Sequence, residues 1–271
     1  MNPVNLAFSK YHGAGNDFIL IDNRVQKWQP VSVEVASLCN RRFGIGADGL
    51  MLLSEEPGYD FRMTYFNSDG MESTLCGNGG RCMAAFAMKL GLAGTKTRFL
   101  AVDGEHEAWQ AGDDQPGMYE LRMQDCRPGA VYPDGIFINT GSPHFVVISD
   151  DAAAENVTGR GRHLRMDRRF SPGGTNVDFT EIRDDGLFVR TYERGVEDET
   201  LSCGTGVTAA VLATAGPGDI LRACRTVQTP GGRFKVFYSR TGDLFTDIVL
   251  HGPVEYVFSG TIALPLPNPR T

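Results

Sequence analysis

The sequence predicts an α+β fold made of two pseudo-symmetric domains, and two observations support that prediction. An internal repeat relates the two halves of the chain at a fixed offset. In each half, short runs of β-branched and aromatic residues, which are typical of strands, accompany one helical segment. The 271 residues also exceed the usual size of one domain, so two medium-sized domains with filled cores are expected.

The repeat is clearest around two cysteines. LCGNGGRCMAA around Cys76 resembles LSCGTGVTAA around Cys203, and 203 − 76 gives an offset of 127 residues. The same offset places Phe18 on Phe145 and continues without a gap as far as Gly104. Two glycine-cysteine turns that merely look alike are the alternative, but the matches outside the motif favour two homologous domains that face each other.

Strands are expected wherever such apolar runs are separated by Gly, Asp and Asn turns. The predicted strands lie around residue 8 and at 18–21, 61–65 and 98–102 in the first half, and around residue 137 and at 145–148, 188–192, 234–238 and 247–250 in the second.

One helix is expected in each half, directly after the repeated cysteine motif. In the first half, residues 80–90 place apolar side chains at helical spacing, and Gly91 is a plausible stop. In the second half, residues 207–215 are apolar nearly all round, which a helix tolerates only when other structure surrounds it. We therefore expect a helix enclosed by strands. Turn clusters between residues 116 and 135 mark the region where the second copy begins.

The composition is that of an ordinary globular protein, with 41% hydrophobic and 22% charged residues. A net charge of −7 disfavours a nucleic-acid partner and favours a small-molecule partner. Neither a signal peptide nor a long apolar segment is visible, so we expect a cytoplasmic protein without a membrane partner. The six cysteines lack the spacing of a disulfide framework or a zinc module and should be reduced thiols.

The two repeated cysteines each precede Gly-x-Gly at the start of a predicted helix. Glycines allow close approach of a ligand, and the N–H groups of a first helical turn have no intrahelical partners, so a carboxylate would fit there. The same field is expected to lower the pKa of each thiol. Two such sites related by pseudo-symmetry would place two sulfurs on opposite sides of one ligand. Stereoinversion needs that geometry, because a base removes a proton from one face while an acid delivers one to the other. This scheme requires no cofactor.

Other interpretations of these residues remain open at this point. Either cysteine alone would more often be a buried apolar filler. Metal ligation by the pair with His12 or His144 is conceivable, but the short ligand spacing is missing, so no metal is expected. The other cysteines, Cys39, Cys82, Cys126 and Cys224, are interpreted as structural.

Several longer motifs resemble the diaminopimelate epimerase family over essentially the whole chain. They are KYHGAGNDF at 10–18, RRFGIGADG at 41–49, FNSDG at 66–70, CGNGGRC at 76–82, PGGTNVDF at 172–179 and ERGVEDETLSCGTG at 193–206. The resemblance implies two domains, residues 1–117 with a returning C-terminal strand at 262–271, and residues 118–261. Each would be a β-barrel-like sheet around a central helix, with the active site in the cleft between them. A homodimer is a further expectation from the family.

The resemblance also implies an activity and its residues. The reaction is conversion of LL-diaminopimelate to the meso isomer in lysine and cell-wall precursor biosynthesis, with Cys76 and Cys203 as the acid/base pair. His144 and Glu193 would support catalysis. The positions implied for substrate binding are Asn16, Asn67, Gly77, Asn78, Asn176, Glu193, Arg194, Gly204 and Thr205. Without the resemblance, turn formation would be the favoured explanation of Asn16, Asn67 and Asn176, and a solvated surface pair would be the commoner case for Glu193 and Arg194.

Two positions depart from the family pattern: many members have Gln where this chain has Gly49, and Asn where it has Ser142. The nearest rival is a proline or hydroxyproline racemase, which shares the two-cysteine logic but whose substrate lacks a distal amino-carboxylate. A non-catalytic amino-acid binding protein is a third possibility, although it would be expected to have lost one cysteine.

Overall fold

The computed structural model describes residues 4–112 and 114–264, and the chain divides into two compact units. Unit 1 contains Met1–Tyr119 and Val254–Thr271, and unit 2 contains Glu120–Pro253. The domain boundaries expected from the sequence lie between residues 117 and 118 and between residues 261 and 262. No helix in the described part of the chain is both long and apolar enough to span a bilayer.

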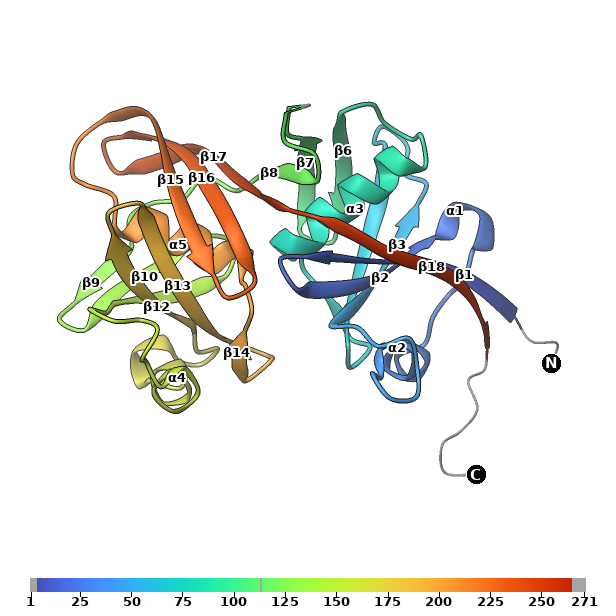
Figure 1. The fold of residues 1–271 in the computed structure, drawn as a ribbon, viewed down its shortest axis with the longest axis horizontal. Coiled ribbons are helices and arrows are strands. Elements are labelled where there is room, and N and C mark those ends of the chain that lie inside the picture. The colour runs from blue at the N-terminus through green and yellow to red at the C-terminus, as the bar shows by residue number, and fades with distance from the viewer. Residues whose placement is uncertain (1–3, 113, 265–271) are drawn as a thin grey trace. The chain divides into compact units, whose positions relative to one another are not determined.

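Unit 1 is a mixed sheet with a helix among its strands (Figure 1). Its strands are β1 (Val4–Gly13), β2 (Asn16–Asp22), β3 (Gly49–Ser54), β4 (Phe61–Asn67), β5 (Glu72–Ser73), β6 (Lys96–Ala101), β7 (Gly104–Gln110) and β18 (Glu255–Leu264). Its helices are α1 (Asn23–Gln26), α2 (Ser32–Cys39) and α3 (Gly77–Lys89). The pairs β2–β3 and β4–β6 are parallel, and the pairs β1–β2, β3–β4, β4–β5 and β6–β7 are antiparallel.

Unit 2 repeats this arrangement around α5 (Figure 1). Its strands are β9 (Ala130–Tyr132), β10 (Gly135–Asn139), β11 (Pro143–Ile148), β12 (Asn176–Arg183), β13 (Gly186–Glu193), β14 (Asp198–Thr200), β15 (Ile220–Thr229), β16 (Gly232–Thr241) and β17 (Leu244–Pro253), and β8 (Met118–Arg122) begins in unit 1. Its helices are α4 (Val157–Arg165), α5 (Gly204–Ala213) and the 3-10 turn η1 (Arg168–Phe170). When β10 is taken as the counterpart of β1, the parallel pairs are again the second strand with the third, β11–β12, and the fourth with the sixth, β13–β15. The predicted α+β class is confirmed.

The internal repeat is confirmed at the level of whole elements. The offset of 127 carries Gly77, the first residue of α3, onto Gly204, the first residue of α5. It also carries Gly49, the first residue of β3, onto Asn176, the first residue of β12. The same ladder order follows in both units, so each copy is one complete folding pattern.

The prediction of a register without gaps is wrong for the strand beside β3. Phe18 is the Cα partner of Gly49, whereas the counterpart of Gly49, Asn176, is paired with His144. Phe18 therefore corresponds to His144 and not to Phe145. The reason is one extra residue between the strands of unit 2: the paired residues are 31 positions apart in unit 1 (49 − 18) and 32 positions apart in unit 2 (176 − 144). The extra residue is accommodated in the connection, so the side chains of each strand keep their orientation toward the inner or outer face of the sheet.

Each sheet is covered by a helix on both faces. On the outer face of unit 1, Leu50 and Leu52 pack with Val35 and Leu38 of α2. On the outer face of unit 2, the corresponding Val177 and Phe179 of β12 pack with α4, as part of a cluster that includes Phe145, Val147, Val157 and Leu164. Because side chains alternate along a strand, the intervening residues of β3 and β12 face the inner helices α3 and α5.

The two outer helices α2 and α4 were not predicted from the sequence. The eight residues of α2 and the nine of α4 are short, and α4 contains two glycines, so neither shows a long helical pattern. Packing against the sheet supplies the stability that their local sequence lacks.

The two inner helices begin three residues earlier than predicted, at Gly77 and Gly204, so the glycines lie within the first turn. Because glycine has a low helix propensity, a prediction from the sequence pattern begins each helix after its glycines. The predicted stop of α3 is confirmed: Gly91 has a φ of 72°, and the N–H of Leu92 donates to the carbonyl of Ala87.

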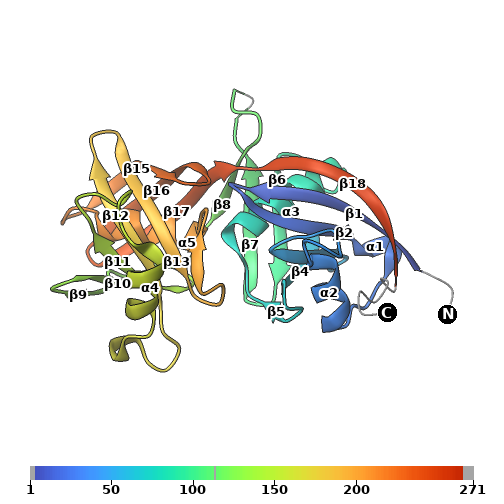
Figure 2. The ribbon, with the colours of Figure 1, turned by 60° about the horizontal axis from the view of Figure 1, so that its bottom comes forward.

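The last strand of unit 1 comes from the end of the chain. β18 runs antiparallel to β1 from Leu264 opposite Val4 to Glu255 opposite His12, and the two ribbons lie side by side in both views (Figures 1 and 2). The predicted returning strand at 262–271 therefore begins earlier than expected, and residues 265–271 lie outside the described residues.

The core of unit 1 should be sensitive to loss of one aromatic ring. Phe99 is fully buried and stacks on Phe61 with ring centroids 4.9 Å apart. We expect Phe99→Ala to lower the free energy of unfolding by about 3–5 kcal/mol, because a cavity replaces the ring. Urea denaturation followed by circular dichroism measures this change. Val102→Ala at an exposed site is the control, and equal effects of the two variants would contradict the prediction.

Candidate active site

Cys76 lies at the N-terminal end of α3 in unit 1. It is the N-cap residue, and its carbonyl accepts the first helical bond from the N–H of Gly80 at 2.8 Å. Its thiol Sγ donates to Asn16 Oδ1 at 3.4 Å, and the Asn78 Nδ2 amide donates to the same oxygen at 3.4 Å. The sulfur, two predicted binding residues and the first turn of the helix are thus brought together.

A group of charged residues holds Asn16 in place. Asn16 Nδ2 donates to Asp48 Oδ2 at 2.8 Å, and Arg41 pairs with both Asp48 at 2.6 Å and Asp17 at 2.7 Å. Lys10 lies 2.6 Å from Asp17. Burial opposes ionisation of Asp17, but hydrogen bonds from Arg41 and Lys10 outweigh it and hold the pKa of this carboxyl below its usual range. The negative charge of Asp17, which shares Arg41 with Asp48, therefore persists well into acid.

The first turn of α3 is fixed by a buried arginine. Arg81 donates to the carbonyl of Gly77 at 3.2 Å and to Asn78 Oδ1 at 2.7 Å. Burial lowers the pKa of Arg81 to about 10, which leaves it charged at neutral pH. In unit 2 the corresponding residue is Thr208, whose hydroxyl donates to the carbonyl of Gly204 at 3.0 Å. The carbonyl of the residue that follows each cysteine, Gly77 or Gly204, therefore accepts a side-chain hydrogen bond from within its own helix.

Asn67 ends β4 directly opposite Gly49, which is one of the two positions that depart from the family pattern. A Cβ at Gly49 would lie 2.5 Å from a ring carbon of Tyr65 and 2.7 Å from the carbonyl oxygen of Phe66. The Tyr65 ring therefore occupies the space that a side chain at position 49 would need. Any contact from position 49 to a ligand is confined to its backbone.

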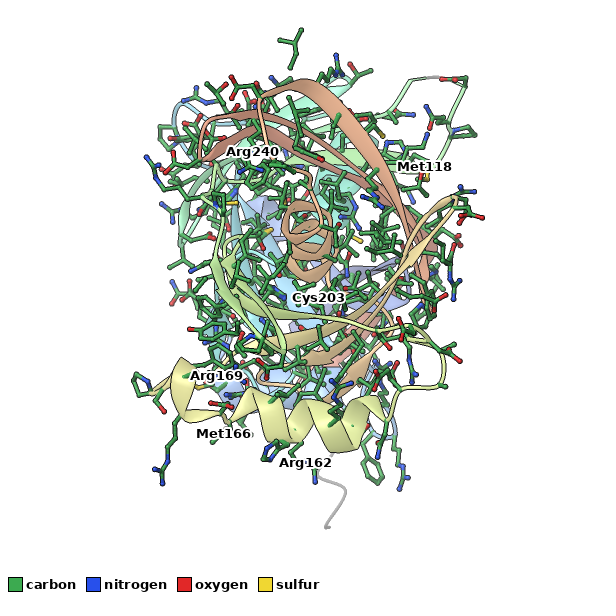
Figure 3. The ribbon with its side chains drawn as sticks, turned by 90° about the vertical axis from the view of Figure 1, so that its left-hand side faces the viewer. Met118, Arg162, Met166, Arg169, Cys203 and Arg240 are labelled. Carbon is green, nitrogen blue, oxygen red and sulfur yellow. The ribbon has the colours of Figure 1, made fainter. Side chains whose placement is uncertain are left out.

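Cys203 occupies the equivalent place in unit 2, at the N-terminal end of α5 (Figure 3). Its carbonyl accepts from the N–H of Val207 at 2.8 Å, and its Sγ lies 3.4 Å from Thr205 Oγ1. Only 9% of its surface is exposed. The two repeated cysteines thus share one backbone setting, as the repeat predicted.

A chain of buried polar contacts continues from Cys203 into the sheet. Thr205 Oγ1 lies 2.8 Å from His144 Nε2, and His144 Nδ1 lies 2.7 Å from Asp178 Oδ2. Both His144 and Asp178 are completely buried. The other oxygen of Asp178 accepts from the hydroxyl of Thr191 at 2.7 Å. His144 is therefore joined to the cysteine through Thr205.

Asn176 connects His144 to the neighbouring loops. Its Oδ1 accepts from the backbone N–H of Arg194 at 2.8 Å, and its Nδ2 donates to the carbonyl of Pro143 at 2.8 Å. The Nδ2 also donates to the hydroxyl of Ser142 at 3.0 Å. Ser142, the second departure from the family pattern, thus has a defined partner within unit 2.

Glu193 and Arg194 follow each other at the end of β13. Glu193 Oε2 accepts from the hydroxyl of Thr200 at 2.8 Å. Arg194 is exposed, and its Nη1 would lie 3.5 Å from a Cβ at Gly173. The guanidinium is consequently accessible beside the glycine loop that precedes Asn176.

The expectation of a lowered thiol pKa is wrong for Cys203. Burial raises its pKa well above the usual value, and the negative charges of Glu193 and Asp178 raise it further. The hydrogen bond from Thr205 and the backbone N–H of Gly206 act in the opposite direction but are weaker. Cys203 is therefore a thiol at neutral pH, because desolvation outweighs the field of the helix end.

The remaining cysteines are not part of this arrangement. Cys39, Cys82 and Cys126 are buried, and Cys224 is exposed on β15. Among the residues that the structure describes, no group of three or more His, Cys, Asp and Glu side chains is placed to hold a metal ion.

Several polar residues of these sites were missed by the sequence analysis, although they lie in the quoted motifs. Asp17 is in KYHGAGNDF, Asp48 is in RRFGIGADG and Asp178 is in PGGTNVDF. A carboxylate inside an apolar strand run, as in NVDF, is the signal that could have identified Asp178, since buried charges need partners.

Solved structures show the fold class. A PhzF-family phenazine biosynthesis protein from Bacillus anthracis has a TM-score of 0.74 at 14% identity, covering 96% of this chain and 99% of its own. A probable proline racemase from Agrobacterium radiobacter has a TM-score of 0.71 at 16% identity, covering 97% and 94%. The chain therefore has the two-unit α+β fold that these proteins share.

The family is shown by sequence. The family model for diaminopimelate epimerase matches residues 8–120 and 136–257. A diaminopimelate epimerase from Flavobacterium psychrophilum is 44% identical over 93% of this chain and 98% of its own length. One from Chlorobaculum tepidum is 40% identical over 93% and 99%. The chain belongs to the diaminopimelate epimerase family, and the resemblance inferred from its motifs is confirmed.

Removing the charge of Glu193 should make Cys203 more reactive. Because Glu193 raises the pKa of the thiol, Glu193→Gln lowers it and increases the thiolate fraction at a fixed pH below the pKa. We expect alkylation of Cys203 by iodoacetamide at pH 8 to accelerate severalfold, because the thiolate is the reactive form. Peptide mass spectrometry measures the rate, with the exposed Cys224 as internal reference. An unchanged or slower rate would contradict the prediction.

Proposed function

We propose that this protein converts LL-diaminopimelate to meso-diaminopimelate without a cofactor, using Cys76 and Cys203 as a thiol/thiolate pair. Membership of the diaminopimelate epimerase family supports the substrate. The observation that supports the chemistry is the placement of both cysteines as N-cap residues of corresponding helices. The product class is a precursor for lysine and for bacterial cell walls.

In the proposed mechanism, one sulfur removes the α-proton as thiolate while the other delivers a proton to the opposite face as thiol. The reverse reaction exchanges the two roles. The developing negative charge spreads into the α-carboxylate, which the first-turn N–H groups after each cysteine would bind. These groups belong to Gly77 and Asn78 in unit 1 and to Gly204 and Thr205 in unit 2. The scheme requires both sulfurs to reach one α-carbon from opposite faces.

The distal end of the substrate is proposed to meet polar groups outside the two helix ends. Arg194 is an exposed guanidinium that can bind a carboxylate through two parallel hydrogen bonds. Glu193 can accept from an ammonium group, and Asn16 and Asn67 can complete the contacts. For Asn176, a substrate contact would replace the bond to Ser142.

His144 and Glu193 are proposed to support catalysis at Cys203. For His144, this role is supported by its contact with Thr205, which in turn contacts Cys203. For Glu193, it is supported by the negative charge that raises the pKa of the Cys203 thiol.

We further propose that the enzyme acts in the cytoplasm as a homodimer, with domains that correspond to residues 1–117 plus the returning strand and 118–261. Three consecutive exposed residues on β18, Tyr256, Val257 and Phe258, support an additional contact surface. The described residues include no metal-binding cluster and no helix able to span a membrane.

The proposed reaction is tested directly by proton NMR in heavy water. The purified protein is incubated with LL-diaminopimelate and no added cofactor, and loss of the α-proton signal is followed with appearance of the meso isomer. Exchange with proline but not with LL-diaminopimelate would overturn the substrate assignment and favour the racemase alternative.

Both cysteines should be indispensable. We expect Cys76→Ser and Cys203→Ser each to lower epimerisation by about a hundredfold or more, because a positioned acid or base contributes at least that much and serine ionises poorly. Circular dichroism should show unchanged folding. If either variant kept more than about a tenth of the wild-type kcat, the two-base mechanism would be wrong.

Arg194 should determine selection of the distal carboxylate. We expect Arg194→Lys to reduce kcat/KM for LL-diaminopimelate strongly, since an ammonium does not reproduce the two parallel bonds of a guanidinium. Lysine and proline, which lack the distal carboxylate, should be turned over up to about ten-thousandfold less efficiently by the wild type. Steady-state assays on the three amino acids measure this selection, and comparable kcat/KM for proline would contradict it.

A further inference from the structure

Unit 2 contains a buried polar cluster that unit 1 lacks at the same places. In unit 2 the inner face of the sheet carries His144, Asn176 and Asp178, and the Cα partner of His144 is Asn176. In unit 1, Phe18 has Gly49 as its Cα partner and Met51 lies two residues further along β3. Phe18 therefore corresponds to His144, Gly49 to Asn176, and Met51 to Asp178.

The contacts to the inner helices show that Met51 and Asp178 are equivalent. A Cβ at Gly79 in the first turn of α3 would lie 2.0 Å from Met51 Cε. A Cβ at Gly206, which is 127 residues further on, would lie 2.4 Å from Asp178 Oδ1. The same contact beneath the helix start is made by a thioether in one unit and by a carboxylate in the other. The fold itself does not require a carboxylate there, so Asp178 needs another explanation.

The hydrogen bonds around Asn176 fix the protonation pattern of His144. The Asn176 Oδ1 must be an acceptor because it faces the backbone N–H of Arg194, and its Nδ2 faces the carbonyl of Pro143. The same Nδ2 lies 3.5 Å from His144 Nε2. The two protons of this amide are directed at Pro143 and Ser142, so the amide presents no acceptor to Nε2, and the Thr205 hydroxyl, 2.8 Å away, can donate to Nε2. The proton of the neutral ring belongs on Nδ1, where the carboxylate of Asp178 accepts it at 2.7 Å.

We propose that Asp178 is a positioning residue that fixes His144 as the Nδ1–H tautomer, and that the Thr205 hydroxyl links His144 to Cys203 for proton transfer. This inference rests on the proposed epimerase function and assigns two further residues to it. The Cys203 thiol donates its proton to Thr205 Oγ1 while the Thr205 hydroxyl proton passes to His144 Nε2. A thiolate, an intact hydroxyl and an imidazolium held by Asp178 result, so charge and protons balance. The reverse transfer restores the thiol.

The sign of the effect of Asp178 distinguishes this role from a direct electrostatic one. The ionisable groups that face Cys203 are Glu193 on β13 and Asp178 on β12, with His144 on β11 reached through Thr205. If the carboxylate of Asp178 acted only on the sulfur, its neutralisation would favour the thiolate, as expected for Glu193. If it acts through His144, neutralisation disfavours the thiolate, because an Asn amide donates to Nδ1 and moves the ring proton to Nε2.

The first test compares Asp178→Asn with Glu193→Gln by alkylation of Cys203 with iodoacetamide at pH 8. We expect the Asp178→Asn rate to fall by about tenfold or more, since the wrong tautomer removes a positioned base, while the Glu193→Gln rate rises. Equal or faster alkylation in Asp178→Asn would overturn the proposal. The assay contains no substrate, so its result is independent of whether diaminopimelate is the right ligand. Failure of the proposed function would instead appear in the heavy-water NMR experiment.

The second test observes the tautomer itself. Long-range ¹H–¹⁵N correlation spectra of the five histidines, with His144 assigned by its loss in His144→Gln, should show an Nδ1–H ring in the wild type and an Nε2–H ring in Asp178→Asn. An Nε2–H ring in the wild type would overturn the proposal. Glu120→Gln, which alters the carboxylate 3.2 Å from the buried His251 on β17, is the matched control and should leave the His144 signals unchanged.

Thr205 provides a test that does not depend on the folding of Asp178→Asn. Thr205→Ser retains the hydroxyl and should keep the alkylation rate of Cys203 within about twofold, whereas Thr205→Val should lower it by about tenfold, as expected when a proton path is removed. Equal rates in the Ser and Val variants would show that the hydroxyl is not the link.

Discussion

Close contact between a helix start and the inner face of a sheet determines how each unit is organised. Residues 79 and 206 lie in the first turns of α3 and α5, and a Cβ at either position would come within 2.4 Å of the sheet side chain beneath it. Glycine removes that obstacle, so the first-turn N–H groups and the preceding cysteine are held against the strands. An outer helix, α2 or α4, closes the other face of the same strands. The position of each sulfur is therefore a consequence of packing across the whole unit.

The same framework supports two different electrostatic environments. Around Cys76, Arg41 and Asp48 are exposed and act through the amide of Asn16, while the buried cation Arg81 binds within α3. Around Cys203, His144 and Asp178 lie in the interior, where a carboxylate needs a close partner to remain charged. His144 supplies that partner for Asp178. Divergence between the two copies is thus concentrated on the inner face of the sheet, while the outer faces remain apolar in both.

Much of this organisation could be predicted from sequence because it depends on spacing. The offset between Cys76 and Cys203 predicted two copies of one pattern, and the Gly-x-Gly motifs predicted helix ends at both cysteines. The outer helices could not be predicted, since their stability comes from packing against the sheet. The one-residue difference between the β2–β3 and β11–β12 connections was also not predicted, because the motifs compared across the repeat match at a constant offset. For that reason the sequence aligned Phe145 with Phe18, although His144 is the true counterpart.

The protonation state of Cys203 was mistaken for a related reason. A helix N-terminus is a local feature that a motif reveals, whereas desolvation and the charges of Glu193 and Asp178 come from strands that are distant in sequence. A two-base inversion must start with one sulfur protonated and the other not. An environment that keeps Cys203 as a thiol satisfies half of that requirement before substrate arrives. The reverse direction then needs a route by which the same thiol can lose its proton inside a dry interior, and the bridge from Thr205 to His144 is the path that the geometry of unit 2 provides.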